Sequence, residues 1–320
     1  MRSGHGHLAQ NLRHHTALLS RRSRVIRPGP LGPYDRPVGD LPERVRLVIF
    51  DLDGVVYRGH EPIAGARELV AWLHAAGVAV RFATNNSMVT RAGYVERLGQ
   101  MGIPTAIEEV VTSTSATVEH LRRHAPDVRS VLAIGADGMR TELGDAGLDV
   151  VMADAAAAER PGGPLGRRFD AVIVGLDPHV DYGRLSAAMS AVAAGARLIA
   201  TNADARYPTA VGFLPGAGSI LAALVTATGA TPEIVGKPAP AMFTATIEAS
   251  AIAASEAVVV GDNPDADVVG AHRAGCAAIL VLTGVADASA AAALEGERLP
   301  EAIADGPDEV RALLAARISG

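Results

Sequence analysis

The sequence predicts an α/β protein built on a parallel sheet with helices on both faces. Two observations carry this prediction: short runs of β-branched residues alternate with helical patterns, and glycines close several of the helices. A third is composition, because 49% hydrophobic residues supply a buried core. A chain of 320 residues has room for about two domains of ordinary size.

The first strand–helix units follow one another between residues 47 and 124. Each strand is a short apolar run, and the helices expected before Gly77 and Gly102 end at a residue that takes the left-handed conformation easily. The expected strands are Leu47–Phe50, Val78–Ala83 and Val110–Val111, and the expected helices run from about Ala64 to Ala76, from about Thr90 to Met101, and up to His124.

A second set of units begins after Pro126 and extends from about Val128 to Ala230, and further strands follow it. Periodicity leaves two architectures open: one long sheet, or a sheet domain with a second α/β domain inserted. The expected strands are Val131–Ile134, Val150–Val151, Ala171–Val174, Leu198–Ala200, Ala257–Val260 and Ala278–Leu282, and a last helix is expected at Asp308–Ile318.

Charge and composition exclude several classes of function. A net charge of -6 argues against a general nucleic-acid binder, and one cysteine, Cys276, builds neither an intrachain disulfide nor a Cys-based zinc site.

Residues 1–42 are rich in Arg, His and Pro without helical or strand period, which predicts a disordered basic leader. Arg21-Arg22 lacks the apolar stretch of an export signal, and we find no apolar run long enough for a membrane span. We therefore expect a cytoplasmic protein with neither a nucleic-acid nor a membrane partner.

The first chemical motif is Asp51-Leu52-Asp53-Gly54, directly after the first expected strand. Two carboxylates this close are costly unless a cation neutralises them or one stays protonated. One carboxylate can then attack an electrophile while its neighbour serves as acid and base. The alternative is an ordinary turn of the form Asp-x-Asp-Gly, and the motif alone does not decide.

Two further motifs supply groups that bind anions. Thr84-Asn85-Asn86-Ser87 ends an expected strand with hydroxyl, amide and backbone N–H groups, although such a cluster also caps helices. Gly236-Lys237-Pro238 contains the single lysine of the chain, a compact positive charge that arginine does not replace well; the alternative is a surface lysine. It is not a phosphate-binding P-loop, because Thr231 and Pro238 stand where that motif needs Gly and Ser or Thr.

A fourth motif, Gly261-Asp262-Asn263-Pro264-Asp265-Ala266-Asp267, follows the strand expected at Ala257–Val260. Three carboxylates at a strand-to-helix junction suit a hard cation with oxygen ligands, and the alternative is a helix start whose acids suit its dipole. All four motifs lie at the ends of expected strands, where parallel sheets bind ligands. Together they supply a nucleophile, an acid/base, an anion cradle, a lysine and a magnesium site, which are the parts needed for phosphoryl transfer.

In this order, the four motifs resemble those of the haloacid dehalogenase (HAD) superfamily, over about residues 47–282. Further segments resemble the signature of its phosphatases with a large α/β cap, a subgroup that includes 4-nitrophenylphosphatase-like, phosphoglycolate and glycerol-3-phosphate phosphatases. The resemblance implies a Rossmann-like core at 43–126 and 231–320 with an α/β cap inserted at 127–230. The segments are Gly175-Leu176-Asp177, Thr201-Asn202-Ala203-Asp204, Tyr207-Pro208 and Pro215-Gly216-Ala217-Gly218-Ser219.

The resemblance also implies a role for each core motif. Asp51 is the nucleophile that becomes an aspartyl-phosphate, and Asp53 protonates the leaving oxygen and then activates water. The phosphate is held by Thr84, Asn85 and Lys237. Magnesium is bound by Asp51, the Asp53 backbone carbonyl and Asp262, with Asp267 in or next to that set.

What the resemblance implies about function is a Mg²⁺-dependent phosphatase acting on small-metabolite phosphomonoesters. Glycerol-3-phosphate or a phosphoglycolate-type substrate is favoured, and a nucleotide or sugar phosphate is the alternative. A phosphotransferase of the same fold and a non-catalytic phosphometabolite sensor are the rival functions. The cap loop with Asn202, Asp204 and Tyr207 is expected to face the core and to set specificity, and a homodimer through the cap is a further implication.

Overall fold

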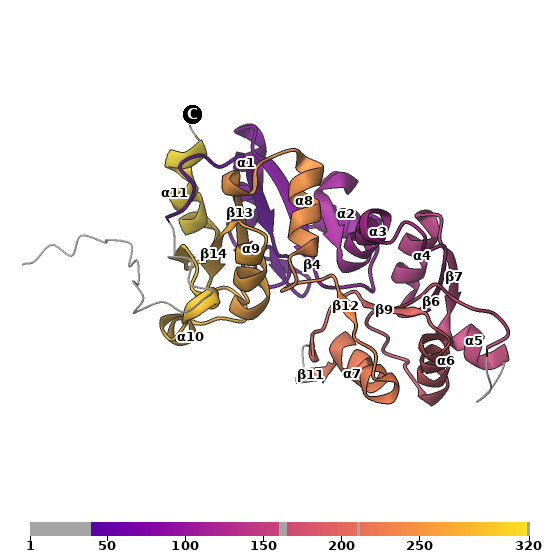
Figure 1. Ribbon diagram of the computed structural model, residues 1–320. Helices are drawn as coiled ribbons and strands as arrows, with labels where there is room; N and C mark the ends of the chain where they lie inside the picture. The colour runs from indigo at the N-terminus through magenta and orange to yellow at the C-terminus, as the bar shows by residue number, and fades with distance from the viewer. Residues whose placement is uncertain (1–39, 160–164, 210–211, 319–320) are drawn as a thin grey trace, which may run out of the picture.

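The structure is a computed structural model that describes residues 40–159, 165–209 and 212–318, so residues 1–39 of the expected leader lie outside the described chain. Two parallel sheets organise the described residues (Figure 1). Apart from two short hairpins, the strands between residues 130 and 234 build the second sheet, and the strands before and after them build the first. The α/β units in the middle of the chain therefore form a unit inserted into the core.

The core sheet has six strands in the order β15-β14-β13-β1-β4-β5, and each neighbouring pair is parallel. β1 (Leu47–Phe50) lies between β13 (Ala257–Gly261) and β4 (Ala79–Thr84). The residues that follow these central strands therefore meet at one edge of the sheet. The outer strands are β5 (Val110–Thr112), β14 (Ala277–Val281) and β15 (Ala302–Ala304).

Both faces of the core sheet are buried, because β1 sends Leu47 and Ile49 into one apolar cluster and Val48 and Phe50 into another. Helices α3, α8 and α9 contribute to the first cluster, and helices α1, α2 and α11 contribute to the second. These helices are α1 (Ala66–Ala75), α2 (Arg91–Gln100), α3 (Ser113–His124), α8 (Ala241–Ser250), α9 (Val269–Arg273) and α11 (Pro307–Ile318).

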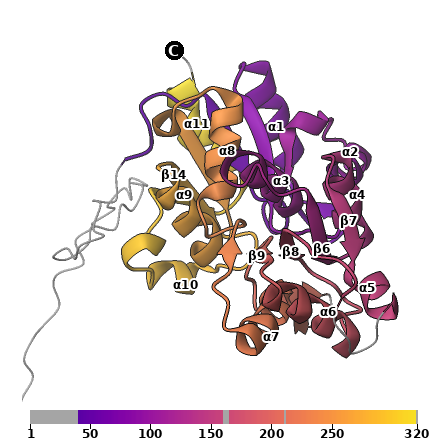
Figure 2. The same ribbon diagram turned by 45° about the vertical axis from the view of Figure 1, so that its right-hand side comes forward.

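The inserted sheet has five parallel strands in the order β12-β9-β8-β6-β7. Helices α5, α6 and α7 cover one face, and Figure 2 shows α6 and α7 on the side away from α3. The other face shares one apolar cluster with α3, α4 and the core sheet. The elements are β6 (Ser130–Ile134), α4 (Asp137–Asp145), β7 (Asp149–Met152), α5 (Ala153–Glu159), β8 (Ala171–Val174), α6 (Tyr182–Ala193), β9 (Arg197–Ala200), α7 (Ala217–Thr228) and β12 (Glu233–Ile234).

The strands and helices expected from periodicity are present, with ends shifted by a few residues. The structure adds short elements that have no period to detect. They are the antiparallel hairpins β2–β3 (Tyr57–Arg58, Glu61–Pro62) and β10–β11 (Arg206–Thr209, Gly212–Pro215), the π-helical turn η3 (Pro264–Val268), the 3₁₀ turns η1 (Ile107–Glu109), η2 (Ala254–Glu256) and η4 (Gly296–Arg298), and α10 (Ala288–Ala292).

The edges of the two units differ from the expected ones at two points. Leu41, which we placed in the leader, is buried in the second core cluster, because its apolar side chain packs beside Val45 and the core strands. β12 pairs with β9, so the inserted sheet continues past residue 230 as the chain returns to the core. Within the described residues, no helix combines the length and the apolar character needed to cross a membrane.

Candidate active site

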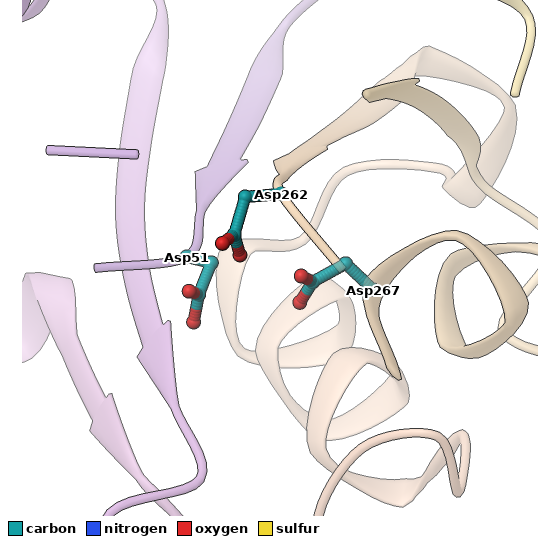
Figure 3. Close-up of side chains that lie close together, drawn as sticks. All are labelled: Asp51, Asp262 and Asp267. Atoms are coloured by element: carbon teal, nitrogen blue, oxygen red, sulfur yellow. The ribbon is translucent and has the colours of Figure 1, made fainter. Parts of the chain in front are cut away.

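The sequence motifs meet at the carboxyl edge of the core sheet. Asp51 directly follows β1, Asp262 directly follows β13, and Asp267 comes from the π-helical turn η3. Figure 3 shows the carboxylates of these three residues turned toward a common space. Lys237 reaches the same space from the loop between β12 and α8.

Lys237 is the buried positive charge of this cluster. Its Nζ donates to Asp51 Oδ1 at 2.5 Å, to Asp267 Oδ1 at 2.7 Å and to the Ala83 carbonyl oxygen at 3.1 Å, so each ammonium hydrogen has an acceptor. Burial alone would lower the pKa of Lys237, but the attraction of Asp267 and Asp51 outweighs burial and raises it. The ammonium therefore stays charged although its side chain is only 3% exposed.

Asp51, Asp262 and Asp267 each offer one carboxylate oxygen, and these oxygens lie within 4.8 Å of one another. Burial raises the pKa of Asp51 and of Asp262, and the negative charge of Asp267 raises both further. When all three acids are ionised, the single ammonium leaves two negative charges unbalanced. Hard oxygen ligands with this charge suit a divalent cation such as Mg²⁺, so the donor set fits that ion.

The segment after β14 holds Asp262 in place. The N–H of Val285 donates to Asp262 Oδ2 at 2.6 Å, and the Thr283 hydroxyl donates to the Gly54 carbonyl oxygen at 2.5 Å. A Cβ on Gly284 or Gly54 would overlap the Asp262 carboxylate, and Gly54 has a φ of 82°. Sequence reasoning missed this segment, whose signal was a Thr-Gly pair directly after an expected strand.

Asp53 has different surroundings: among the described residues, the carboxylate cluster does not include it, and its side chain is exposed. Burial by nearby groups raises the pKa of Asp53, while the positive charge of Arg97 opposes the increase. The Arg97 guanidinium is fixed over the Tyr57 ring, 4.2 Å from its centre, and it donates to the Gly59 carbonyl. The binding of a cation by the Asp53 backbone carbonyl stays a prediction.

Thr84 is the last residue of β4 and Asn85 follows it, so both come close to Lys237 and its cluster. The Thr84 hydroxyl accepts from the Asn86 N–H at 3.2 Å and also bonds to Tyr94. The Asn85 side chain makes three hydrogen bonds within the protein, two with the backbone of Lys237 and one with a carboxylate of the inserted unit. A phosphate contact by Asn85 would therefore fall to its backbone N–H, and the phosphate-binding role of both residues stays a prediction.

The inserted unit brings its expected loop to the same place. Asn202 is buried and donates to the Asn85 carbonyl oxygen at 2.7 Å, and Asp204 Oδ2 accepts from Asn85 Nδ2 at 3.0 Å. Tyr207 is half-buried on β10 and lies near enough to Tyr94 to contribute to the raised pKa of that residue. The three residues thus lie close to the site, and their role in specificity stays a prediction.

Comparison with known proteins places this geometry in a family. The model of the haloacid dehalogenase-like hydrolases matches residues 48–149, and a HAD-hydrolase-like model matches residues 234–309. The acid sugar phosphatase of Staphylococcus aureus (strain MRSA252) is 35% identical over 243 residues, which is 76% of this chain and 88% of that protein. The chain belongs to the haloacid dehalogenase-like hydrolases.

Solved structures of similar proteins agree with this family. A hypothetical protein from Pyrococcus horikoshii OT3 superposes with a TM-score of 0.75 at 36% identity, covering 84% of this chain and 99% of that one. The glycerol phosphate phosphatase of Mycobacterium tuberculosis, in complex with magnesium, superposes with a TM-score of 0.72 at 34% identity, covering 82% of this chain and 76% of that one.

The family and these relatives confirm the resemblance drawn from the motifs. The chain is a HAD-like phosphoric monoester hydrolase with a Rossmann-like core and an inserted α/β cap domain. Phosphatases of this family use Mg²⁺, and the carboxylates of Asp51, Asp262 and Asp267 are a suitable donor set for that ion. Asp267 lies in the cluster itself and also bonds to Lys237.

Proposed function

We propose that this HAD phosphatase hydrolyses phosphate esters of small metabolites through an aspartyl-phosphate on Asp51. The observation that carries the proposal is the contact of the buried Lys237 ammonium with Asp51 Oδ1 at 2.5 Å. A charged lysine that touches the nucleophile supplies positive charge where a dianionic phosphoryl group must approach a carboxylate. The exposed carboxyl of Asp53 lies beside this space, where a leaving group or a water can reach it.

In the first step, a carboxylate oxygen of Asp51 attacks phosphorus. The new oxygen–phosphorus bond forms as the bond to the leaving oxygen breaks, and Asp53 gives its proton to that oxygen. Desolvation by nearby groups raises the pKa of Asp53 from its usual value, and this step needs Asp53 in its protonated form. Lys237 holds Asp51 in position and offsets the charge of the phosphoryl oxygens.

In the second step, water attacks the phosphorus of the aspartyl-phosphate. Asp53, now a carboxylate, takes a proton from the water as the bond from phosphorus to Asp51 breaks, and phosphate leaves. We assign cation binding to Asp51, Asp262 and the Asp53 backbone carbonyl, with Asp267 beside or within that set. Mg²⁺ bound there supplies positive charge that offsets the charge of the phosphoryl group.

For the substrate, we propose the phosphate ester of a small polyhydroxylated alcohol, with glycerol-3-phosphate first and a sugar phosphate second. The similarity to a glycerol phosphate phosphatase and to an acid sugar phosphatase supports this class. Tyr207, which lies on β10 and is near enough to Tyr94 to contribute to the raised pKa of that residue, is the residue that we assign to contact the alcohol. Phosphoglycolate and nucleotides are the alternatives, and a homodimer through the cap and a cytoplasmic location stay predictions.

A phosphate-release screen tests the proposal. The panel contains glycerol-3-phosphate, hexose phosphates, phosphoglycolate and nucleoside monophosphates, each with Mg²⁺ and with EDTA. We expect the highest kcat/KM for a polyol or sugar phosphate and loss of release in EDTA. A flat panel in Mg²⁺ would favour the phosphometabolite sensor, and turnover that rises with added alcohol without added free phosphate would favour the phosphotransferase.

A further inference from the structure

The side-chain amide of Asn85 makes two hydrogen bonds with the backbone of Lys237. Asn85 Nδ2 donates to the Lys237 carbonyl oxygen at 2.9 Å, and Asn85 Oδ1 accepts from the Lys237 N–H, also at 2.9 Å. The amide therefore acts as a neighbouring peptide would in a sheet, and it fixes both backbone groups of one residue. The position of the Lys237 backbone in turn limits where its ammonium can lie between Asp51 and Asp267.

Asp204 of the inserted unit completes the contacts of this amide. Asn85 Nδ2 has two hydrogens, and the one not used by Lys237 is donated to Asp204 Oδ2 at 3.0 Å. An ionised carboxylate only accepts hydrogen bonds, so it favours the amide orientation that turns Nδ2 toward Asp204 and Oδ1 toward the Lys237 N–H. Burial raises the pKa of Asp204, so the position is unfavourable for a charge, and the contact with Asn85 partly offsets this.

Neighbouring residues make the approach of the two segments possible. A Cβ on Gly236 would come within 2.6 Å of Asn85 Oδ1 and would overlap the Thr201 carbonyl oxygen, so this glycine permits the close contact. Asn202 donates to the Asn85 carbonyl oxygen at 2.7 Å and accepts from the Asp204 N–H at 3.1 Å. Asn202 therefore binds the main chain of Asn85, and Asp204 binds its side chain.

We propose that Asp204 is a positioning residue, which orients the Asn85 amide and through it fixes Lys237 for phosphoryl transfer. The proposal rests on the proposed function and deepens it, because it gives the inserted unit a part in assembling the phosphate site. It also changes the expectation for Asp204 and Asn202, which the sequence assigned to substrate specificity. In this role, the two residues act on every substrate alike, and discrimination falls to Tyr207.

Two variants separate the hydrogen bond from the charge. Asp204→Ala removes the acceptor, and we expect kcat to fall by up to about 10²-fold, the cost of misplacing a catalytic group by about 1 Å. The factor should be the same for p-nitrophenyl phosphate, glycerol-3-phosphate and glucose-6-phosphate, because these substrates share only the phosphoryl group. Asp204→Asn keeps an acceptor oxygen and should recover most of the activity. A loss that differs between the three substrates would overturn the proposal in favour of a specificity role.

A second measurement needs no substrate. The exchange rate of the Lys237 amide hydrogen, followed by NMR, should rise in Asp204→Ala and stay near that of the wild type in Asp204→Asn. The matched control is Asp181→Ala, which removes another carboxylate of the inserted unit that accepts one N–H, from Arg184 at 2.8 Å, at the start of α6.

We expect the Asp181→Ala control to leave Lys237 exchange and turnover unchanged, and thermal unfolding confirms that each variant is folded. Unchanged Lys237 exchange in folded Asp204→Ala would refute the positioning role even if activity were low. If the wild-type protein releases no phosphate from any ester, the proposed function fails, and the exchange rates still decide the proposal about Asp204.

Discussion

The carboxyl ends of the strands in the two sheets carry different chemistry. After β1 and β13 of the core sheet, ionisable side chains gather within a few ångströms of one another and of Lys237. After β8 and β9 of the inserted sheet, the residues contact the loop that follows β4. The Leu176 N–H donates to Ser87 Oγ at 3.0 Å, and Asn202 donates to the Asn85 carbonyl oxygen. The carboxyl edge of the core sheet therefore concentrates charged groups, and the carboxyl edge of the inserted sheet binds the core loop that follows β4.

The difference shows in which residues the close approach requires. A Cβ on Gly175 would lie 2.6 Å from Ser87 Oγ, and a Cβ on Gly138 would overlap the Met88 carbonyl oxygen. These glycines let the inserted unit lie against the core loop, whereas Gly54 and Gly284 leave room for a carboxylate. Substitutions at the carboxyl edge of the core sheet should therefore change turnover. Substitutions where the inserted unit contacts the core should change stability or the placement of core residues.

The largest effect is expected from Asp51→Asn, which removes the proposed nucleophile and keeps the shape of the side chain. We expect turnover to fall by about 10⁴-fold or more, in the range seen for the loss of other nucleophiles, with the circular dichroism spectrum unchanged. The control is Asp265→Asn, because this acid belongs to the same motif as Asp262 but has a side chain that is 78% exposed. Normal turnover in Asp51→Asn would exclude Asp51 as the nucleophile.

Lys237→Arg tests whether positive charge alone is sufficient. The lysine side chain is 3% exposed, and its three donors point to three separate acceptors. The wider, planar guanidinium does not reproduce this arrangement, so we expect kcat to fall by about 10²–10³-fold. Steady-state kinetics at saturating Mg²⁺ measures the effect. Activity close to that of the wild type would show that the pocket needs the charge and not its geometry.

Glu142 tests the docking side of the comparison. This residue of α4 is buried, and its carboxylate accepts from the Arg91 N–H at 2.7 Å and from the Thr112 hydroxyl at 2.5 Å, both in the core. Glu142→Ala leaves two donors without this partner, so we expect the free energy of unfolding to fall by about 1–3 kcal/mol. Urea unfolding measures the change, and Asp145→Ala, an exposed position on the same helix, is the control. A fall in kcat per folded molecule without a fall in the free energy of unfolding would contradict a docking role.

The smallest effect concerns the core away from the reactive edge. His272 Nδ1 contacts the Glu297 carbonyl oxygen at 2.8 Å, and Nε2 contacts Glu301 at 3.2 Å. Burial would lower the pKa of His272, but the hydrogen bond and charge of Glu301 prevail and raise it above 6.5. A raised pKa in the folded state stabilises the protein fully below the unfolded value, and this stabilisation is lost as pH rises through the folded value.

We therefore expect wild-type stability to fall more steeply between pH 6 and pH 9 than that of His272→Gln. Urea unfolding of both proteins at several pH values gives the difference, in which the titration of other groups cancels. A difference that is constant with pH, or that grows in favour of the wild type at high pH, would show that His272 is not the responsible group.

Much of the fold was predictable because the central strands are short and rich in apolar residues, and β1 and β13 contain no polar side chain. β1 lies at the expected residues Leu47–Phe50, and the motifs that begin at Asp51, Thr84 and Gly261 lie at the ends of the core strands from which they were inferred. Gly236-Lys237-Pro238 instead follows β12, a two-residue strand of the inserted sheet that was not expected. Parallel strands bring their carboxyl ends together, so adjacency in space followed from adjacency in the sheet. The two-residue strands of β2–β3 and the hairpin β10–β11 had no period long enough to detect.

The residues that sequence reasoning missed are those whose neighbours come from distant elements. Tyr94 and Arg97 lie one turn apart on α2, and nothing in their local pattern indicates that the helix lies beside Asp53 and Thr84. The same holds for Glu142, whose partners come from α2 and from the end of β5. Such contacts depend on how elements that are distant in the sequence pack together, which periodicity does not encode.

One apolar cluster extends from the core sheet through α3 and α4 into the inserted sheet. This cluster limits how readily the two units can be separated or exchanged between related proteins. Ile49 of the core and Ile173 of the inserted sheet belong to this one cluster. Cutting the chain between the units would expose a hydrophobic face on each part, so we expect a single cooperative melting transition for both units. A cap borrowed from a related phosphatase would bring its own α4, so the facing surface of α3 would need to be exchanged along with it.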